Sequence, residues 1–473
     1  MTKNRPFNIE IISAWFLALL FSVLVTSNLI FGFNLALYGL TAVIGLLVTL
    51  VWPRSGLLAM FFLTLVFAKQ FSLSNVIINQ EEYKFYLIDI FLLAVYFRVV
   101  LDWLKINRPA IKGVDWLLIA FMIWTALSYA VSVAYGDAIT PVAFSSLKNY
   151  IFYPALYFAV WFLFRSRDDW RQLFNFFIAG VVVSLGFLVY GLVTGVGLWT
   201  ELTPLTTSGA RLIDFDHAFY LALAIIVALP IIIYGHSRYK QVLAWLVPLF
   251  LLGVLGSLMR HLWLALLVYL AWFIYSIGNQ RRIFKYWLTR YLALGTIILS
   301  LLAFVVAVIP QSSLSNQANV QRGYLVTRAM SFFDSEDSSF AWRSSLWRGV
   351  WSELAVNPLF GLGLGQRIYL DMGSYKDYVE LRNIHNSFLA ITTQLGLVGI
   401  ILLATLVLNL FIRVWRISLS DHYLQMKKLI LLGVLVFCSV AFLFQPYLEA
   451  NWFSIWWWLA LGLSRSLYEN STS

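Results

Sequence analysis

The stretch HNSFLAITTQLGLVGIILLATLVLNLFI, residues 385–412, contains no Asp, Glu, Lys or Arg. A helix needs about 20 consecutive, mostly apolar residues to cross the hydrocarbon core of a bilayer. Residues 385–412 meet this requirement and predict a membrane-spanning helix. Similar apolar runs recur along the chain, so the same reading extends to the whole sequence.

The composition agrees with a chain whose main solvent is lipid. Of its 473 residues, 61% are hydrophobic and 12% are charged, whereas soluble domains carry about 25% charged residues. The sequence therefore predicts an all-α, polytopic membrane protein with about 14 transmembrane helices. We expect them at residues 10–30, 33–52, 56–69, 84–101, 115–135, 146–164, 173–193, 215–234, 240–257, 261–277, 289–309, 385–412, 427–446 and 450–465.

The basic residues predict how the chain is oriented in the membrane. When the connections are assigned alternately to the two sides, 21 of the 33 Lys and Arg residues fall on one side. Cytoplasmic connections carry the excess of Lys and Arg, so this side is the cytoplasm and holds both termini. The net charge of +11 is then an orientation signal. It does not indicate a nucleic-acid partner.

We expect three parts along the chain. Residues 1–309 hold transmembrane helices 1–11, residues 310–384 form a large loop outside the cytoplasm, and residues 385–473 hold helices 12–14 with a cytoplasmic C-terminal tail. A loop of this length is uncommon unless it is functional or disordered. The single cysteine, Cys438, excludes an intrachain disulfide.

The large loop contains one segment with helical periodicity. In SSFAWRSSLWRGVWSELAVNP, residues 338–358, apolar or aromatic side chains recur at 340, 342, 346, 347, 350, 351 and 354. This spacing predicts an amphipathic helix. We expect it to lie over the membrane surface with Trp342, Trp347 and Trp351 on or near one face.

The run PLFGLGLG, residues 358–365, has glycine spacing similar to that of phosphate-binding loops. Such loops follow a strand and open a helix. This run follows no predicted strand, so we interpret it as a flexible turn that leads back to the membrane.

Cationic side chains at the outer helix ends are the best candidates for chemistry. Arg211 precedes one predicted span, Arg260 lies at the outer edge between two, and His385 opens another, with Arg382 three residues earlier. Guanidinium groups bind phosphate in a bidentate way, and a neutral imidazole can take a proton from a hydroxyl. Each single Arg is equally well explained as an interfacial side chain that reaches toward water. Together the groups favour a reaction on a lipid diphosphate.

Metal and cofactor chemistry have no sequence support. The five histidines show no metal-ligand spacing, and no HExxH or paired cysteine motif is present. We therefore expect neither a metal nor a cofactor.

The segment from His385 resembles the O-antigen ligase and Wzy-type O-antigen polymerase superfamily of bacterial envelope glycosyltransferases. The ligase pattern is His, then Asn, Ser or Gln, nine residues, Gly, two residues, and Gly, Thr or Tyr. His385, Asn386, Gly396 and Gly399 match every fixed position. Arg260 begins a match to the Arg-x3-Leu element of the family.

The resemblance extends to two further arginines. Arg343 stands at the usual arginine of the stretch before the histidine, and Arg211 resembles the first family arginine by its placement before the next span. The matched features cover roughly residues 205–400.

The resemblance implies a metal-independent glycosyltransferase. It would move a glycan from an undecaprenyl-diphosphate carrier to a hydroxyl of an acceptor sugar. His385 is then the catalytic base, and Arg211 and Arg260 bind the diphosphate. Arg382 and Arg343 are secondary candidates for positioning. Asn386 either orients His385 or caps the following helix.

The resemblance also implies a location and partners. We expect a multi-pass protein of the bacterial cytoplasmic (inner) membrane, with both termini in the cytoplasm and the active site on the periplasmic side. The partners are the undecaprenyl-diphosphate-linked glycan, the acceptor and membrane lipids. The acceptor is the lipid A core for a ligase and a growing lipid-linked glycan for a polymerase. The histidine pattern favours the ligase and the number of spans favours the polymerase.

Two other classes of function stay open. A secondary transporter would show internal repeats, broken helices and ionisable residues at mid-membrane. No repeat is evident, and Asp89 is the acidic residue that lies clearly within a span, where Lys84 or Arg98 could pair with it. A structural scaffold for envelope assembly would have no use for Arg and His at the outer helix ends.

Overall fold

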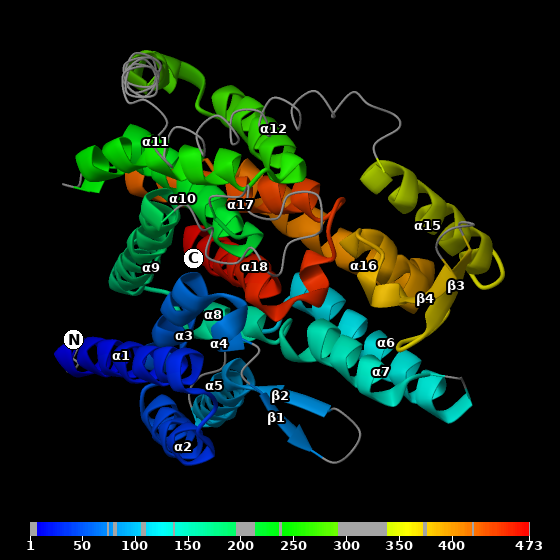
Figure 1. The fold of residues 1–473 in the computed structure, drawn as a ribbon. Coiled ribbons are helices and arrows are strands. Elements are labelled where there is room, and N and C mark those ends of the chain that lie inside the picture. The colour runs from blue at the N-terminus through cyan, green and yellow to red at the C-terminus, as the bar shows by residue number, and fades with distance from the viewer. Residues whose placement is uncertain are drawn as a thin grey trace. The chain divides into compact units, whose positions relative to one another are not determined.

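The computed structural model describes residues 7–72, 75–78, 83–105, 110–135, 138–194, 213–235, 239–291, 338–371, 376–418 and 421–472. Within these residues the chain is mostly helical (Figure 1). Six helices are long and apolar enough to cross a membrane: Ile9–Phe31, Gly113–Tyr135, Arg167–Val189, Phe215–Tyr234, Ser387–Arg416 and His422–Ala441. This agrees with an all-α membrane protein.

The number of about 14 transmembrane helices is not confirmed. Four further apolar helices have only 10–17 residues: Leu35–Val51, Pro53–Phe67, Lys240–Gly256 and Arg260–Ser276. The predicted span at 146–164 is divided into several short elements, and the predicted span at 289–309 lies almost entirely outside the described residues.

Large apolar side chains cover much of the molecule's exterior. Phe31 is 83% exposed, Leu19 67% and Trp245 65%. Patches of this kind are unfavourable in water and mark surfaces that contact a partner or lipid. Their position on long apolar helices is that of lipid-facing residues.

The described residues fall into two compact units. The first comprises residues 1–180, 338–417 and 442–473, and the second comprises residues 181–337 and 418–441.

The first unit holds most of the helices and both small sheets. In chain order its elements are α1 (Phe7–Phe31), α2 (Leu35–Val51), α3 (Pro53–Phe67), α4 (Lys69–Ser72), β1 (Asn75–Ile78), β2 (Tyr83–Tyr86), α5 (Leu87–Lys105), α6 (Gly113–Tyr135), α7 (Thr140–Leu147), η1 (Lys148–Phe152), α8 (Leu156–Leu163), the first half of α9 (Arg167–Thr194), α15 (Ser338–Leu354), β3 (Arg367–Asp371), β4 (Lys376–Glu380), η4 (Leu381–Asn383), α16 (Ser387–Arg416), η5 (Tyr447–Glu449) and α18 (Asn451–Thr472).

The regular elements described in the second unit are all helices. The unit contains the rest of α9, α10 (Phe215–Tyr234), α11 (Tyr239–Gly256), α12 (Arg260–Ser276), η3 (Gly278–Gln280) and α17 (His422–Ala441). Helix α17 packs against α10 and α12, where Gly433 lies close to Tyr269.

A proline explains why the predicted span at 146–164 is broken. Pro154 has no N–H to donate and its ring crowds the preceding turn, which disfavours a regular helix at this position. The chain widens into the π-helix η1, where the Tyr153 N–H donates to the Lys148 carbonyl at 3.1 Å, before α8 begins. Isolated π-turns are frequent at functional sites.

Helix α16 is kinked at Gly396, which has φ 67° and ψ −172°. The interruption frees backbone groups that need new partners. The indole N–H of Trp124 on α6 donates to the Leu395 carbonyl at 2.8 Å, and the Leu397 N–H donates to the Pro358 carbonyl at 2.9 Å. The kink is therefore fixed by contacts from outside the helix.

The glycine-rich segment 358–365 supplies part of that support. Leu362 N–H donates to the Thr393 carbonyl at 2.7 Å, and Leu364 N–H donates to Ser132 Oγ at 2.9 Å. The three glycines of the segment have positive φ. The interpretation as a flexible turn is wrong, because this segment is hydrogen-bonded to α6 and α16.

The amphipathic helix predicted in the large loop is present as α15, with one correction. Leu346, Val350 and Leu354 are buried, and Trp342 and Trp347 pack against a cluster that includes the first two. Trp351 is 56% exposed and lies on another face.

Two antiparallel hairpins were not predicted. Strand β1 pairs with β2, and β3 pairs with β4 in the register Arg367 to Glu380.

Candidate functional site

His385 lies in the connection between η4 and α16, in the first unit. Its φ is +54°, in the left-handed region that non-glycine residues rarely adopt. Such backbone strain persists only where the surroundings hold it, and it is concentrated at functional sites. Among the described residues, Ala68, Leu258 and His385 are the non-glycine residues with positive φ. Leu258 lies two residues before Arg260.

The His385 ring is held by the connection between α17 and α18. Nδ1 of His385 lies 3.0 Å from Oε1 of Gln445. With the amide oxygen facing the ring, Nδ1–H donates to it, and the lone pair of the neutral imidazole is then on Nε2. Nε2 makes no hydrogen bond within the described part of the chain. The ring is thus arranged to accept a proton at Nε2.

The connection that carries Gln445 is itself fixed to the start of α16. Ser387 Oγ donates to the Gln445 carbonyl at 2.9 Å and accepts from the Leu448 N–H at 3.1 Å. The Ser387 N–H donates to the Phe442 carbonyl at 2.8 Å. These bonds set the distance between Gln445 and the imidazole.

Helix α15 covers the other side of the His385 segment. The ring centroids of Trp342 and His385 are 5.2 Å apart with an interplanar angle of 88°. The indole N–H of Trp347 donates to the Ile384 carbonyl at 2.8 Å. The tryptophans therefore define one wall of the site and hold the backbone just before His385.

The surroundings favour a neutral His385. Burial, and then the positive charge of Arg343, lower the pKa of the imidazole from 6.5 to about 4, while the hydrogen bond to Gln445 acts in the opposite direction. At neutral pH the imidazole is therefore unprotonated. That is the form that a general base needs.

Arg382 and Asn386 have defined partners in this site. Arg382 Nε donates to Glu380 Oε2 at 2.7 Å, and its Nη1 donates to Ser145 Oγ at 2.8 Å. Asn386 Oδ1 accepts from the Leu389 N–H at 3.0 Å and caps α16. Of the two roles considered for Asn386, the structure shows the cap. The ring of His385 donates instead to Gln445 Oε1.

The other predicted cations lie elsewhere in the chain. Arg260 is half-buried at the first position of α12, in the second unit, and Arg211 is outside the described residues. The structure thus groups His385 with Arg343 and Arg382. The convergence of Arg211 and Arg260 on His385 stays a prediction.

The comparison with known families agrees with this site. Residues 245–404 match the Wzy_C family model, described as O-antigen ligase. This similarity covers about a third of the chain and supports the O-antigen ligase and Wzy polymerase superfamily. The match includes Arg260, Arg343 and the segment from His385 to Gly399. No curated protein matches the sequence.

Members of the O-antigen ligase family are glycosyltransferase-like enzymes. The family match ends before α17, so it does not include the connection that holds Gln445. Gln445 was missed by sequence reasoning because nothing nearby in the sequence relates it to His385, 60 residues earlier.

A second group that sequence reasoning missed surrounds Glu449. Its carboxylate accepts hydrogen bonds from the Tyr150 hydroxyl, from Asn149 Nδ2 at 3.0 Å and from Gln394 Nε2 at 3.0 Å. Burial raises the pKa of Glu449 to about 8, and the hydrogen bond from Asn149 opposes this rise. Glu449 thereby ties the α17–α18 connection to η1 and α16.

Of the two partners expected for Asp89, Arg98 is paired elsewhere, and the side chain of Lys84 lies outside what the structure describes. Asp89 forms a buried ion pair with Lys148 of η1 and accepts a hydrogen bond from the Tyr153 hydroxyl at 2.7 Å. Arg98 pairs instead with Asp102 at 2.9 Å. The broken helix brings Lys148 to the start of α5, a contact that one-dimensional spacing cannot reveal.

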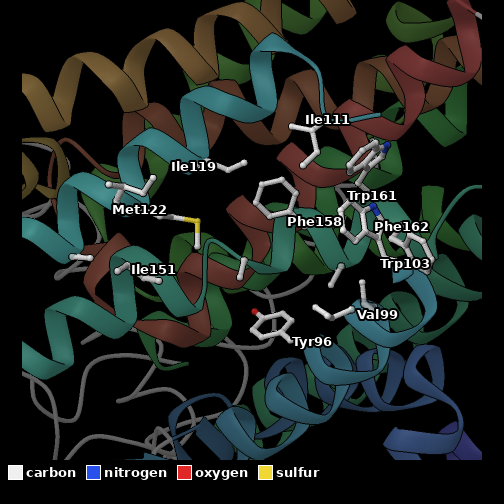
Figure 2. A pocket seen from close by; sticks show the side chains of 15 residues that line it. Tyr96, Val99, Trp103, Ile111, Ile119, Met122, Ile151, Phe158, Trp161 and Phe162 are labelled. Carbon is white, nitrogen blue, oxygen red and sulfur yellow. The ribbon is translucent and has the colours of Figure 1, made fainter. Parts of the chain in front are cut away.

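The same unit contains an apolar crevice of about 540 Å³ (Figure 2). Figure 2 shows side chains of Tyr96, Trp103, Met122 and Phe158 around it. Its lining residues carry no formal charge, so the crevice suits a hydrocarbon chain.

Proposed function

We propose that this protein transfers a glycan from an undecaprenyl-diphosphate carrier to a hydroxyl of an acceptor sugar, on the periplasmic side of the inner membrane. The observation that carries the proposal is His385, neutral and strained, with Nδ1 on Gln445 and Nε2 available as a proton acceptor. The family match supports the type of reaction.

The transfer step needs one base and a stabilised leaving group. Nε2 of His385 takes the proton of the acceptor hydroxyl. The oxygen of that hydroxyl bonds at the same time to the anomeric carbon of the donor. The bond from that carbon to the diphosphate oxygen breaks, and the electron pair leaves with the diphosphate. Arg211 and Arg260 are proposed to bind the diphosphate and stabilise its growing charge. The apolar crevice could hold part of the carrier's hydrocarbon chain.

Contacts between helices support the predicted sidedness. Three contacts join residues that were assigned to the outer helix ends: His385 to Gln445, Asn149 to Glu449, and Asp89 to Lys148. Two contacts join residues that were assigned to the cytoplasmic side: Arg54 to Asp169 and Arg465 to Asp115. Each of these pairs joins residues of one predicted side.

Transfer from lipid-linked glycan in proteoliposomes tests the function. His385→Ala should abolish transfer, because it removes the proposed acceptor of the hydroxyl proton. His422→Ala, on α17, is the matched histidine control and should transfer normally. Normal transfer by a folded His385→Ala protein would exclude the proposed mechanism.

A ligase acting on the lipid A core is the first reading, and a Wzy-type O-antigen or exopolysaccharide polymerase is the alternative. Deletion in the native host followed by glycan gel analysis separates them. Loss of all polymer from the lipid A core identifies a ligase. Single repeats that remain attached identify a polymerase.

Secondary transport is a second candidate that specific features favour. The helix is broken between α7 and α8, α16 is kinked at Gly396, and Lys148 pairs with a buried Asp89. Broken helices and buried charges are typical of transporters. A flux assay in proteoliposomes, run beside the transfer assay, separates the two classes. Flux without transfer would replace the enzyme proposal.

A further inference from the structure

The β3–β4 hairpin presents an ordered row of side chains on one face. The strands pair Arg367 with Glu380, Tyr369 with Tyr378, and Asp371 with Lys376. Because successive residues of a strand point to opposite faces, these three pairs share one face. The row consists of an ion pair of 3.5 Å, a tyrosine pair with ring centroids 5.2 Å apart, and an ion pair of 2.8 Å.

The two faces of the hairpin have different surroundings. On the inner face, Ile368 and Val379 belong to a buried cluster with Leu346 and Val350 of α15. On the outer face, Tyr369 is 52% exposed and Tyr378 is 62% exposed. The hairpin is therefore anchored by one face, which leaves the tyrosines of the other face accessible.

The row is continuous with the His385 site. Glu380 lies at one end of the row, where Oε1 pairs with Arg367 and Oε2 accepts from Arg382 Nε at 2.7 Å. His385 follows Arg382 by three residues, across the turn η4. The row thus begins beside the proposed reaction centre and continues away from it along the strands.

The chemistry of the row matches that of a sugar chain. A sugar ring has an apolar C–H face and a rim of hydroxyls. Two exposed tyrosine rings offer apolar surface for the first, and their hydroxyls and the flanking ion pairs offer donors and acceptors for the second. At about 3.4 Å per residue, successive pairs are about 7 Å apart, so the row is long enough for a short oligosaccharide.

We propose that the outer face of the β3–β4 hairpin is a binding surface for the glycan chain, with Tyr369 and Tyr378 as its stacking residues. The inference rests on the proposed function for the identity of the ligand. The surface holds sugars that are not at the reacting bond, so it acts on glycan binding and leaves the proton transfer to His385.

Glycan binding to the purified full-length protein tests this surface. The probe is the water-soluble glycan hydrolysed from the host's own lipid carrier, and binding is measured by ligand-observed NMR or thermophoresis. The double variant Y369T/Y378T removes both rings but keeps a strong preference for the strand, because threonine is β-branched. It should bind the glycan at least tenfold more weakly. Y369F/Y378F keeps both rings and should bind within about threefold of wild type.

Two controls separate this inference from the proposed function and from misfolding. Tyr135→Thr removes a tyrosine that is 88% exposed at the end of α6 and should leave binding unchanged. His385→Ala should lose transfer but keep glycan binding. Wild-type binding by Y369T/Y378T, or no glycan binding by the wild-type protein, would overturn the binding surface, whatever His385→Ala does to transfer. Loss of binding in Y369F/Y378F as well would also overturn stacking as its basis.

Discussion

A Cβ atom on Gly361 would lie 2.5 Å from the backbone nitrogen of Gly396. The same crowding holds in reverse, since a Cβ on Gly396 would lie 2.1 Å from the Leu359 carbonyl oxygen. Gly396 is a fixed position of the family pattern that begins at His385. The glycine at this position of the pattern therefore allows the close backbone approach between the glycine-rich segment and the kink of α16, eleven residues after the proposed base.

Gly396→Ala should destabilise the protein strongly. The substitution adds a methyl group against backbone and places Ala at φ 67°, so a loss of about 2 kcal/mol or more is expected. Thermal unfolding in detergent measures it. Gly186→Ala is the matched control, because no atom lies within 4 Å of its added Cβ. An alanine at 396 that unfolds at the wild-type temperature would contradict the close packing.

Gln445→Leu should reduce transfer by about 10²-fold without unfolding the protein. The leucine cannot accept from Nδ1–H, so the His385 ring loses the bond that fixes its tautomer and orientation. Gln445→Glu should keep the acceptor. Its negative charge should raise the pKa of His385, and the acidic limit of activity should move to higher pH. Equal pH profiles for Gln445→Glu and wild type would show that this contact does not govern the base.

Sequence reasoning could locate His385 because a local pattern surrounds it, and it could place helices because apolar runs are long. It could not find Gln445 or Glu449, which meet α16 only through the folded chain. The two strands RIYLD (367–371) and KDYVE (376–380) were also missed. They are short, and the helical periodicity of the segment before them is the stronger pattern. The pairing of Lys148 with Asp89 could not be found either, because the two residues are 59 positions apart and meet only in the folded chain.

Arg260→Lys should weaken binding of the lipid-linked donor, although the substitution keeps the positive charge. An ammonium carries the same charge but cannot form the bidentate contact with a diphosphate. Donor binding to protein in nanodiscs measures the effect, and a tenfold or greater loss is expected. Arg282→Lys, on the predicted cytoplasmic side, is the control. Unchanged donor affinity in Arg260→Lys would remove Arg260 from the diphosphate site.

Transfer should persist well below neutral pH. With a pKa of about 4, His385 is neutral above that value, so the rate should fall only as the pH drops through about 4. Arg343→Leu removes a charge that lowers this pKa, so its rate should fall at a higher pH than that of wild type. Rates between pH 3 and 8, with unfolding temperatures at each pH, test both points. A fall of the wild-type rate near pH 6.5 in folded protein would contradict a buried neutral base.

Glu449 should make stability depend on pH in the direction opposite to an ordinary salt-bridged acid. Its pKa is raised to about 8 in the folded protein, whereas an unfolded Glu has a pKa of about 4.3. Between these two pKa values the folded state holds a proton that the unfolded state has lost. The stabilisation that this proton gives is complete below the pKa of the unfolded Glu and disappears as the pH rises to about 8.

Glu449→Gln should remove this part of the pH dependence and keep an acceptor for Asn149 and Tyr150. Glu449→Ala should lower the unfolding temperature at all pH values, because buried donors lose their acceptor. It should also reduce transfer, since the connection that carries Gln445 is no longer fixed. Identical slopes of unfolding temperature against pH for wild type and Glu449→Gln would show that Glu449 holds no such proton.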